Sequence, residues 1–275
     1  MSSLGGPLAT PGGPPVVRRK PARISWRATA IALVSTVVVF GGLAWVIVNA
    51  PNWPAVQKAF LNGPIFWYSL PLLVNAFWKN IELFLIAEML ILPLALVIAV
   101  MRGLPGPALF PLRALATGYV DIFRALPGIL VIYVLGFGVP GLRLPGVPTD
   151  PFFWAIVALT LIYSAYVSEV YRSGIDSIHP SQDAAARSLG LTWWQDLREI
   201  VFPMALRVSL PSWTGLTLGV MKDTSLVLWI GVVELLRSSQ VIITRIQEPL
   251  LVLLICGAMY FVISFPISRL GDRLE

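Results

Sequence analysis

Six long apolar runs, separated by shorter polar segments, make up most of the chain. They occupy residues 28–48, 81–101, about 125–139, 152–171, about 208–230 and 250–267. A helix needs about 20 apolar residues to cross the hydrocarbon core of a bilayer, and most of these runs approach that length. The pattern predicts an all-α membrane protein with about six transmembrane helices. An even number of crossings would bring both termini to the same side of the membrane.

Composition and charge agree with this prediction. Hydrophobic residues make up 57% of the 275 residues, charged residues make up 12%, and the mean hydropathy is +0.80, which excludes an ordinary soluble domain. The net charge of +6 does not indicate nucleic-acid binding, because the basic residues stand at the ends of apolar runs. Such residues mark the cytoplasmic side of a membrane protein. They gather before the first run and after the last, at Arg18, Arg19, Lys20, Arg23, Arg27, Arg269 and Arg273. We therefore expect both termini in the cytoplasm, together with the polar loop over residues 175–203.

The first 27 residues differ from the rest of the chain. They are rich in Gly and Pro, end in a basic cluster, and offer little that a fold could bury, so we predict a disordered basic tail over residues 1–27. The run over residues 28–48 should be an additional N-terminal transmembrane helix. A cleaved signal peptide is the alternative, but its apolar core would span only about 7–15 residues. Pro51 would also follow the cut.

A polar, Ala-rich segment interrupts the apolar pattern after residue 175. It predicts a short helix with Ser181 as N-cap, Asp183 in its first turn, Arg187 near its end and Gly190 just beyond it. This helix carries three consecutive alanines, Ala184, Ala185 and Ala186. Because small side chains let a groove of another protein approach closely, the segment is typical of a docking loop.

A second helix is expected directly after this loop helix. Thr192 and Gln195 have the spacing of a capping box, and Pro203 should limit the length of the helix.

One acidic residue lies inside an apolar run. Glu88 is about a third of the way along residues 81–101, where a charge costs about 2 kcal/mol or more unless it faces protein or water. Pro93 removes a backbone hydrogen bond and should kink this helix. Glu88 could line a cavity for a cationic or ammonium-bearing solute, or it could hydrogen-bond to a neighbouring helix.

Two further charges, Lys222 and Asp223, lie within the run over about residues 208–230. Adjacent helix positions do not face each other, so each charge needs its own partner or a local break in the helix. Thr224 and Ser225 supply hydroxyls that can bond the backbone at such a break. The four residues either form a structural network or line a translocation path.

The remaining polar segments predict local contacts and loops. Glu169 and Arg172, three residues apart near the end of their run, could form an ion pair. The amphipathic segment over residues 105–124, interrupted by Pro107 and Pro111, should lie along the cytosolic surface. The loops on the outer side are expected at about residues 49–79, 141–150 and 234–248.

Several kinds of chemistry lack the residues they need. His179 is the only histidine and Cys256 the only cysteine, so the chain cannot build a His/Cys metal site or an intrachain disulfide. We expect His179 to be a solvated loop residue. No Gly-x-x-x-x-Gly-Lys-Ser/Thr loop occurs, so an ATP site of that type would belong to another chain. We expect no catalytic residue, metal or cofactor in this chain.

The polar loop resembles the cytoplasmic loop of ABC importer permeases, whose pattern is Glu-Ala-Ala, three residues, Gly, nine residues, Ile, one residue and Leu-Pro. Matching positions are Ala185, Ala186, Gly190, Ile200 and Pro203, while Ala184 replaces the Glu and Phe202 replaces the Leu. Other residues resemble the polar amino-acid branch of these permeases. They are Tyr119-Val120-Asp121, Phe123-Arg124-Ala125-Leu126-Pro127, Ala165-Tyr166-Val167-Ser168-Glu169, Arg172, Ile175, Gln182 and Lys222-Asp223-Thr224-Ser225-Leu226. The resemblance covers residues 70–275.

This resemblance implies the type I ABC importer permease fold and a place in a bacterial inner membrane. Two such subunits, identical or homologous, would form the pore, and a dimer of ATPase subunits would bind ATP and Mg²⁺. An extracytoplasmic binding protein would deliver the solute, and the chain itself would be a transport subunit and not an enzyme. The loop helix would be the coupling helix that docks on the ATPase, through Gln182, Asp183, Ala184, Ala185, Ala186, Arg187, Ser188 and Gly190. The translocation-path candidates are Glu88, Lys222, Asp223, Thr224 and Ser225.

Two other interpretations stay open. An ABC permease for another small solute, such as methionine, phosphonate, an opine or an ectoine-like compound, would share the loop, although the Lys-Asp-Thr-Ser-Leu run favours the polar amino-acid branch. A secondary transporter that works without ATP would need no docking loop, and it should show inverted repeats or paired broken helices. The sequence shows neither.

Overall fold

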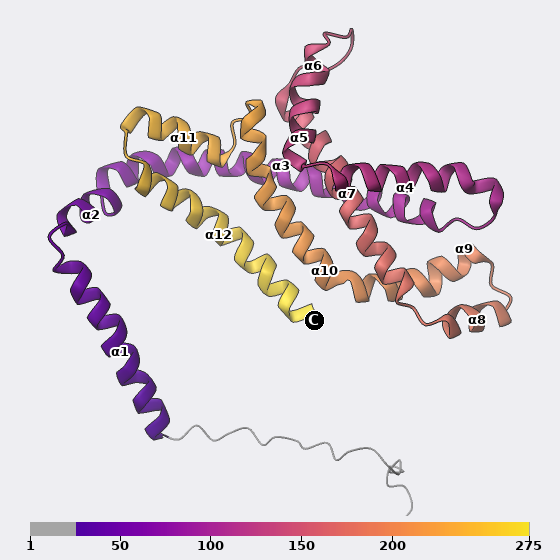
Figure 1. Ribbon diagram of the computed structural model, residues 1–275, viewed down its shortest axis with the longest axis horizontal. Helices are drawn as coiled ribbons and strands as arrows, with labels where there is room; N and C mark the ends of the chain where they lie inside the picture. Colours follow the sequence, from indigo (N-terminus) through magenta and orange to yellow (C-terminus); the bar gives the residue numbers. More distant parts are fainter. Residues whose placement is uncertain (1–25, 275) are drawn as a thin grey trace, which may run out of the picture. The chain divides into compact units, whose positions relative to one another are not determined.

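The protein is helical throughout the part of the chain that the structure describes. The computed structural model describes residues 26–274, and every element in that range is a helix (Figure 1). The chain divides into two compact units, Met1–Val56 and Gln57–Glu275. In the first unit, α1 (Trp26–Val48) has the length and hydropathy of a membrane span, and none of its residues is buried.

Helix α1 covers the apolar run over residues 28–48, for which an additional transmembrane helix is predicted. Of the tail expected over residues 1–27, only Trp26 and Arg27 are described, and both belong to the first turn of α1. The rest of that prediction lies outside the described residues. A short helix, α2 (Trp53–Phe60), follows.

Helix α3 (Gly63–Gly103) is the longest element of the second unit. It begins where the side-chain oxygen of Asn62 accepts a hydrogen bond from the Ile65 N–H at 3.3 Å. The outer loop expected over residues 49–79 is therefore wrong for its second half, which is helical. Helix α3 continues without interruption through Pro93, the position at which a kink is expected. Buried side chains of neighbouring helices pack along α3 and hold it.

The segment over residues 105–124 is also more regularly helical than the sequence predicts. Helix α4 (Phe110–Ala125) follows the short 3₁₀ turn η1 (Pro107–Leu109), and Pro111 lies in its first turn. Pro111 does not interrupt the helix, because N–H groups of a first turn have no partner within the helix. Helix α4 packs against α3 and α7, and its buried residues are Ala116 and Val120.

After Leu126 and Pro127 the chain turns sharply. The elements α5 (Gly128–Tyr133), η2 (Val134–Gly138) and α6 (Val139–Gly141) together run at 104° to the direction of α4. The X-Pro dipeptide explains the turn, because proline disfavours helical backbone at the residue before it.

Helix α7 (Pro151–Asp176) lies at the centre of the second unit and packs against α3, α4 and α10. Its start is capped by Asp150, whose carboxylate accepts from the Phe152 N–H at 3.1 Å. Near its end, Gly174 allows a close approach to α10 (Phe202–Asp223). A Cβ atom at Gly174 would stand 2.7 Å from the carbonyl oxygen of Ala205.

The remaining elements complete the bundle. The polar loop forms α8 (Pro180–Ser188), α9 (Trp193–Asp196) and the π-helical segment η3 (Leu197–Val201). Helix α10 is followed by the 3₁₀ segment η4 (Thr224–Ile230), α11 (Leu235–Ile246) and α12 (Pro249–Leu274). Helices α10 and α12 pack side by side (Figure 1).

Two apolar cores make up most of the packing of this unit, and a third, smaller cluster joins α3, α4 and α7 around Val120. The larger core lies between α3, α7, α10 and η4, where Leu83, Ile91, Leu159 and Met221 are fully buried. The smaller core joins the first half of α3 to α11 and α12. Leu73, Leu235 and Val252 are fully buried there.

The number of membrane spans agrees with the sequence prediction. Four helical stretches among the described residues are long and apolar enough to cross a membrane, and the total reaches six if each of two bent pairs counts as one span. The second bent pair joins Trp193–Ile230 to α11 at an angle of 51°.

Candidate functional site

The polar loop begins differently from the prediction. His179, and not Ser181, is the N-cap of α8: its Nδ1 atom accepts a hydrogen bond from the Ser181 N–H at 3.2 Å. The helix starts at Pro180, whose fixed φ suits a first turn and whose missing N–H needs no partner there. His179 is exposed, as expected for a loop residue, but it also has this local structural role.

The end of α8 is as predicted. The helix stops at Ser188, and Gly190 adopts a left-handed backbone with φ of +78°, which glycine tolerates better than other residues. Ala186 is buried, whereas Ala184, Ala185 and Leu189 are exposed. Helix α8 thus holds one alanine against the protein and presents a surface of small side chains, together with Leu189, to the outside.

The second loop helix has the predicted start and a different end. The Thr192 N–H donates to Gln195 Oε1 at 2.9 Å, and the Gln195 N–H donates to Thr192 Oγ1 at 3.4 Å, which is a complete capping box. Pro203 does not end the helix, because the chain passes from α9 through η3 into α10. At that junction the Phe202 N–H bonds to the Leu197 carbonyl, five residues back. This wider π-helical turn accommodates a proline in the first turn of α10.

A cavity of about 230 Å³ lies between this loop and the C-terminal ends of α3 and α7. Val100 and Gly103 of α3 and Ile175 of α7 line one side, and Arg187 and Asp196 of the loop line the other. The loop and the ends of α3 and α7 thus enclose this cavity together.

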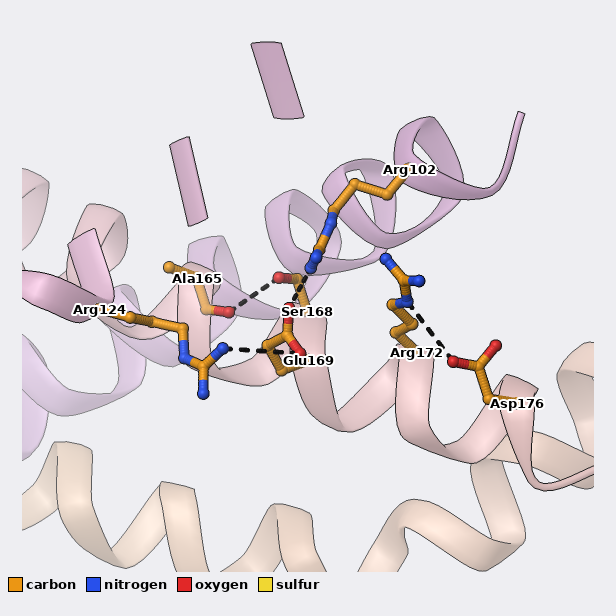
Figure 2. Close-up of polar contacts among 7 residues, drawn as sticks. All are labelled: Arg102, Arg124, Ala165, Ser168, Glu169, Arg172 and Asp176. Carbon is orange, nitrogen blue, oxygen red and sulfur yellow. Dashed lines mark hydrogen bonds and ion pairs between the residues drawn. The ribbon is translucent and has the colours of Figure 1, made fainter. Parts of the chain in front are cut away.

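An ionic cluster joins three helices near the end of α7 (Figure 2). Glu169 of α7 bonds to Arg102 of α3 and also approaches Arg124 of α4, with 3.6 Å between Oε2 and Nη1. The side chain of Arg102 is only 10% exposed. We call Glu169, Arg102 and Arg124 the three-helix clamp.

The predicted pair between Glu169 and Arg172 is wrong. Arg172 instead pairs with Asp176, one turn further along α7, at 3.4 Å (Figure 2). The arginines of two other helices reach Glu169 from the side, and no pattern within the α7 sequence could reveal them.

Glu88 makes a contact between helices. Its Oε1 atom accepts a hydrogen bond from the Thr217 hydroxyl of α10 at 2.7 Å, whereas its Oε2 atom is buried without a hydrogen-bond partner among the described residues. The bond to a neighbouring helix, one of the two interpretations of Glu88, is present.

The run of Lys222 to Ser225 contains the predicted break. Helix α10 ends at Asp223, and a 3₁₀ segment begins at Thr224. The Thr224 hydroxyl donates to the Met221 carbonyl at 2.6 Å, and the Ser225 hydroxyl donates to the Lys222 carbonyl at 2.7 Å. These are the backbone-directed hydroxyls that the sequence predicts.

The two charged residues at this break, Lys222 and Asp223, have different surroundings. The Tyr163 hydroxyl of α7 donates to Asp223 Oδ2 at 2.8 Å. Lys222 is exposed, and its ammonium has no hydrogen bond or ion pair within residues 26–274. Lys222 and Ser225 line a cavity of about 320 Å³ together with Cys256 and Tyr260.

Sequence reasoning missed a buried polar cluster beside this cavity. Asn80 of α3, Thr224 of η4, Glu234 before α11 and Tyr260 of α12 are joined by hydrogen bonds. The sequence places Glu234 in an outer loop, yet it is completely buried. Its position directly before an apolar helix is the one local signal, because a carboxylate is a good N-cap.

The structure keeps the two groups of candidate residues apart in the fold. The loop residues lie on α8, whereas Glu88 bonds to α10, the helix that ends at Asp223. Within residues 26–274 there is no group of three or more His, Cys, Asp and Glu side chains that could hold a metal ion.

The protein is thus a helical membrane bundle with a capped polar loop. Residues 108–275 match the family described as "Binding-protein-dependent transport system inner membrane component". The chain belongs to this family, whose members are multi-pass inner-membrane subunits of transport systems and work with a binding protein and a separate ATPase.

Individual relatives are permeases of transport systems for amino acids and an opine. The chain is 31% identical to the L-cystine transport system permease protein of Bacillus subtilis, over 82% of this chain and 91% of the relative. It is 30% identical to the glutamate/aspartate import permease protein of Escherichia coli, over 75% and 93%. It is 36% identical to the nopaline transport system permease protein of Agrobacterium fabrum, over 57% and 68%.

Solved structures give the same fold. The chain is similar to a structure titled "Crystal structure of an amino acid ABC transporter with histidines", with a TM-score of 0.67 and 27% identity over 75% of this chain and 94% of the other. A methionine ABC transporter in an inward-facing conformation gives a TM-score of 0.60 at 19% identity over 78% and 99%, which supports the fold alone.

Proposed function

We propose that this chain forms the pore through which a polar amino acid or a related small solute enters the cell, driven by ATP hydrolysis on a separate ATPase pair. The relatives named for nopaline, glutamate/aspartate and L-cystine support this class of solute. A second permease subunit, identical or homologous, completes the pore, and a binding protein delivers the solute from outside.

The coupling contact is the part of this proposal that the geometry supports best. Helix α8 is short and capped at both ends, it packs against α9 and η3, and its Ala186 is buried. Its Arg187 lines the cavity that the ends of α3 and α7 also line. Its exposed alanines leave room for the surface of an ATPase to approach. A short rigid helix with small exposed side chains can transmit a rigid-body displacement into the bundle. The family position of Glu is Ala184 here, so docking at this position relies on shape.

The solute path is proposed along the cavity at the break after α10. Lys222 supplies a cation without an internal partner there, and such a group attracts the carboxylate of an amino acid. Ser225 lies beside it, whereas Asp223 and Thr224 are bonded to other helices and shape the turn. Glu88 is the further candidate on α3, and its second carboxylate oxygen can accept from an ammonium group.

The orientation follows from the basic residues. The positive clusters before α1 and at the end of α12 favour the cytoplasmic side for both termini. We place α8 on that side, where the ATPase would meet it.

The experiment that tests this function measures ATP hydrolysis by the assembled complex in lipid. Binding proteins loaded with nopaline, L-glutamate, L-aspartate, L-glutamine or L-cystine would be added in turn, and the wild type compared with Gly190→Arg. We expect one loaded binding protein to stimulate hydrolysis, and Gly190→Arg to return the rate to its basal value. The control is Gly106→Arg, because Gly106 has a similar φ of +85° and no atom within 4 Å of an added Cβ, yet it lies before η1 and not in the polar loop over residues 175–203. Uptake that persists on an ion gradient without any ATPase would refute the proposal and favour a secondary transporter.

A further inference from the structure

A buried cluster of four hydrogen-bonded polar side chains contacts the break after α10. Asn80, Thr224, Glu234 and Tyr260 come from four elements, α3, η4, the start of α11 and α12. Asn80, Thr224 and Glu234 are completely buried. Burying a polar group costs free energy unless the group is hydrogen-bonded. The hydrogen bonds of these side chains therefore indicate the role of the cluster.

Glu234 is the centre of the cluster. Its carboxylate accepts from the N–H groups of Leu236 and Arg237, at 2.8 and 2.7 Å, and thereby caps α11. It also accepts from the Tyr260 hydroxyl at 3.1 Å and from the Asn80 amide at 3.3 Å. Two backbone groups and two side chains thus fix the position of this carboxylate among three helices.

Asn80 connects Glu234 to the break. Its side-chain amide also donates to Thr224 Oγ1 at 3.0 Å. Thr224 is the first residue of η4 and directly follows Lys222 and Asp223. Asp223, the residue before Thr224, accepts a hydrogen bond from Tyr163 of α7. The turn is therefore held by hydrogen bonds from two other helices, and Lys222 lines the cavity that Tyr260 also lines.

We propose that Glu234 and Asn80 are positioning residues that hold the Lys222 side chain in the solute path. This inference rests on the proposed function, because it takes the Lys222 cavity as part of that path. Neither residue lines the cavity. Each acts through the turn: Glu234 orients the Asn80 amide, the amide holds Thr224, and Thr224 fixes the direction in which α10 ends.

A double-mutant cycle tests whether Glu234 acts through Lys222. The assembled importer in proteoliposomes would be assayed for uptake of the panel member that stimulates wild-type ATP hydrolysis, with the KM and maximal rate measured separately. Lys222→Met is expected to raise KM about tenfold or more, because a hydrogen bond to a charged group is lost. Glu234→Gln should raise KM by about fivefold. In the Lys222→Met background Glu234→Gln should add less than about twofold, because the two residues act as one unit.

Asn80→Leu is the second variant, because it removes the link to Thr224 and leaves the Glu234 cap of α11 in place. Glu82→Gln is the control, since Glu82 lies two residues further along α3 in an exposed pair with Lys79 at 2.7 Å. It should leave KM unchanged. Thermal unfolding of each variant would separate a loss of fold from a change in KM.

The possible outcomes are distinct. If Lys222→Met leaves KM unchanged, the proposed path is wrong and the positioning role falls with it. If Lys222→Met raises KM but Asn80→Leu and Glu234→Gln do not, or if their effects multiply with that of Lys222→Met, the path stands and the positioning role is refuted.

Discussion

Neutralising Glu169 should destabilise the bundle far more than neutralising Asp176 on the same helix. Glu169 holds Arg102 of α3 and Arg124 of α4, whereas the one ion pair of Asp176 among the described residues is with Arg172 of the same helix. The variants Glu169→Gln and Asp176→Asn each remove one negative charge and keep the size of the side chain. The comparison therefore isolates the three-helix clamp from a general effect of charge on α7.

The magnitude follows from exposure. Arg102 is 10% exposed and would lose its acidic partner, and a broken buried pair costs about 3–5 kcal/mol. Glu169 itself is 31% exposed, so water replaces part of the lost interaction, and we expect about 2–3 kcal/mol. The pair of Arg172 and Asp176 is 46% and 66% exposed. It should contribute about 0.5 kcal/mol or less.

Thermal unfolding of the purified protein in lipid would measure this difference. A cost of about 2–3 kcal/mol corresponds to a fall in Tm of roughly 4–12 °C, and the Asp176→Asn variant should change by about 1–2 °C at most. The double variant Glu169→Gln with Arg102→Gln should recover part of the loss, because it removes the unpaired buried charge. Equal Tm values for Glu169→Gln and Asp176→Asn would show that the clamp adds no stability and would refute the reasoning.

Two further changes test local features of the loop and of helix packing. His179→Ala should destabilise the start of α8 by about 1 kcal/mol, whereas His179→Asn should retain the cap. Amide hydrogen exchange of the α8 backbone would measure both effects. Equal exchange rates in the wild type and in His179→Ala would show that His179 is not the cap. Gly174→Ala should separate α7 from α10 and lower Tm, because its Cβ would stand 2.7 Å from a carbonyl oxygen of α10. Gly257→Ala in α12 is its control, since nothing lies within 4 Å of that Cβ, and equal Tm values would contradict the close packing.

Local features of the fold could be predicted from the sequence because their causes are local. The capping box of Thr192 and Gln195 involves residues three apart, and the left-handed Gly190 directly follows its own helix. The break at Lys222 and Asp223 is likewise signalled by adjacent charges in an apolar run. In each case the residues that decide the structure are within one turn of one another.

Contacts between distant helices could not be predicted in this way. Asn80 and Glu234 are 154 residues apart, and Arg102 and Glu169 are 67 apart. Glu234 follows an apolar run and precedes another, so its sequence context is that of a loop residue. Its burial depends on donors from α3 and α12 that only the folded bundle brings together. Pro203 failed as a helix end for a different reason, because a π-helical turn accommodates it.

The contacts along α7 show how the loop and the solute path can act together. Tyr163, Glu169 and Asp176 lie on one uninterrupted helix, and α8 begins four residues after its end. From Tyr163 to Asp176 the helix extends about 20 Å at 1.5 Å per residue. In the proposed mechanism the ATPase displaces α8, and the clamp makes α3 and α4 move with α7. At the middle of α7, Tyr163 would pull on Asp223, which is adjacent to Lys222. A displacement at α8 therefore reaches the turn that carries Lys222 through a single rigid helix, with no need for a change of fold.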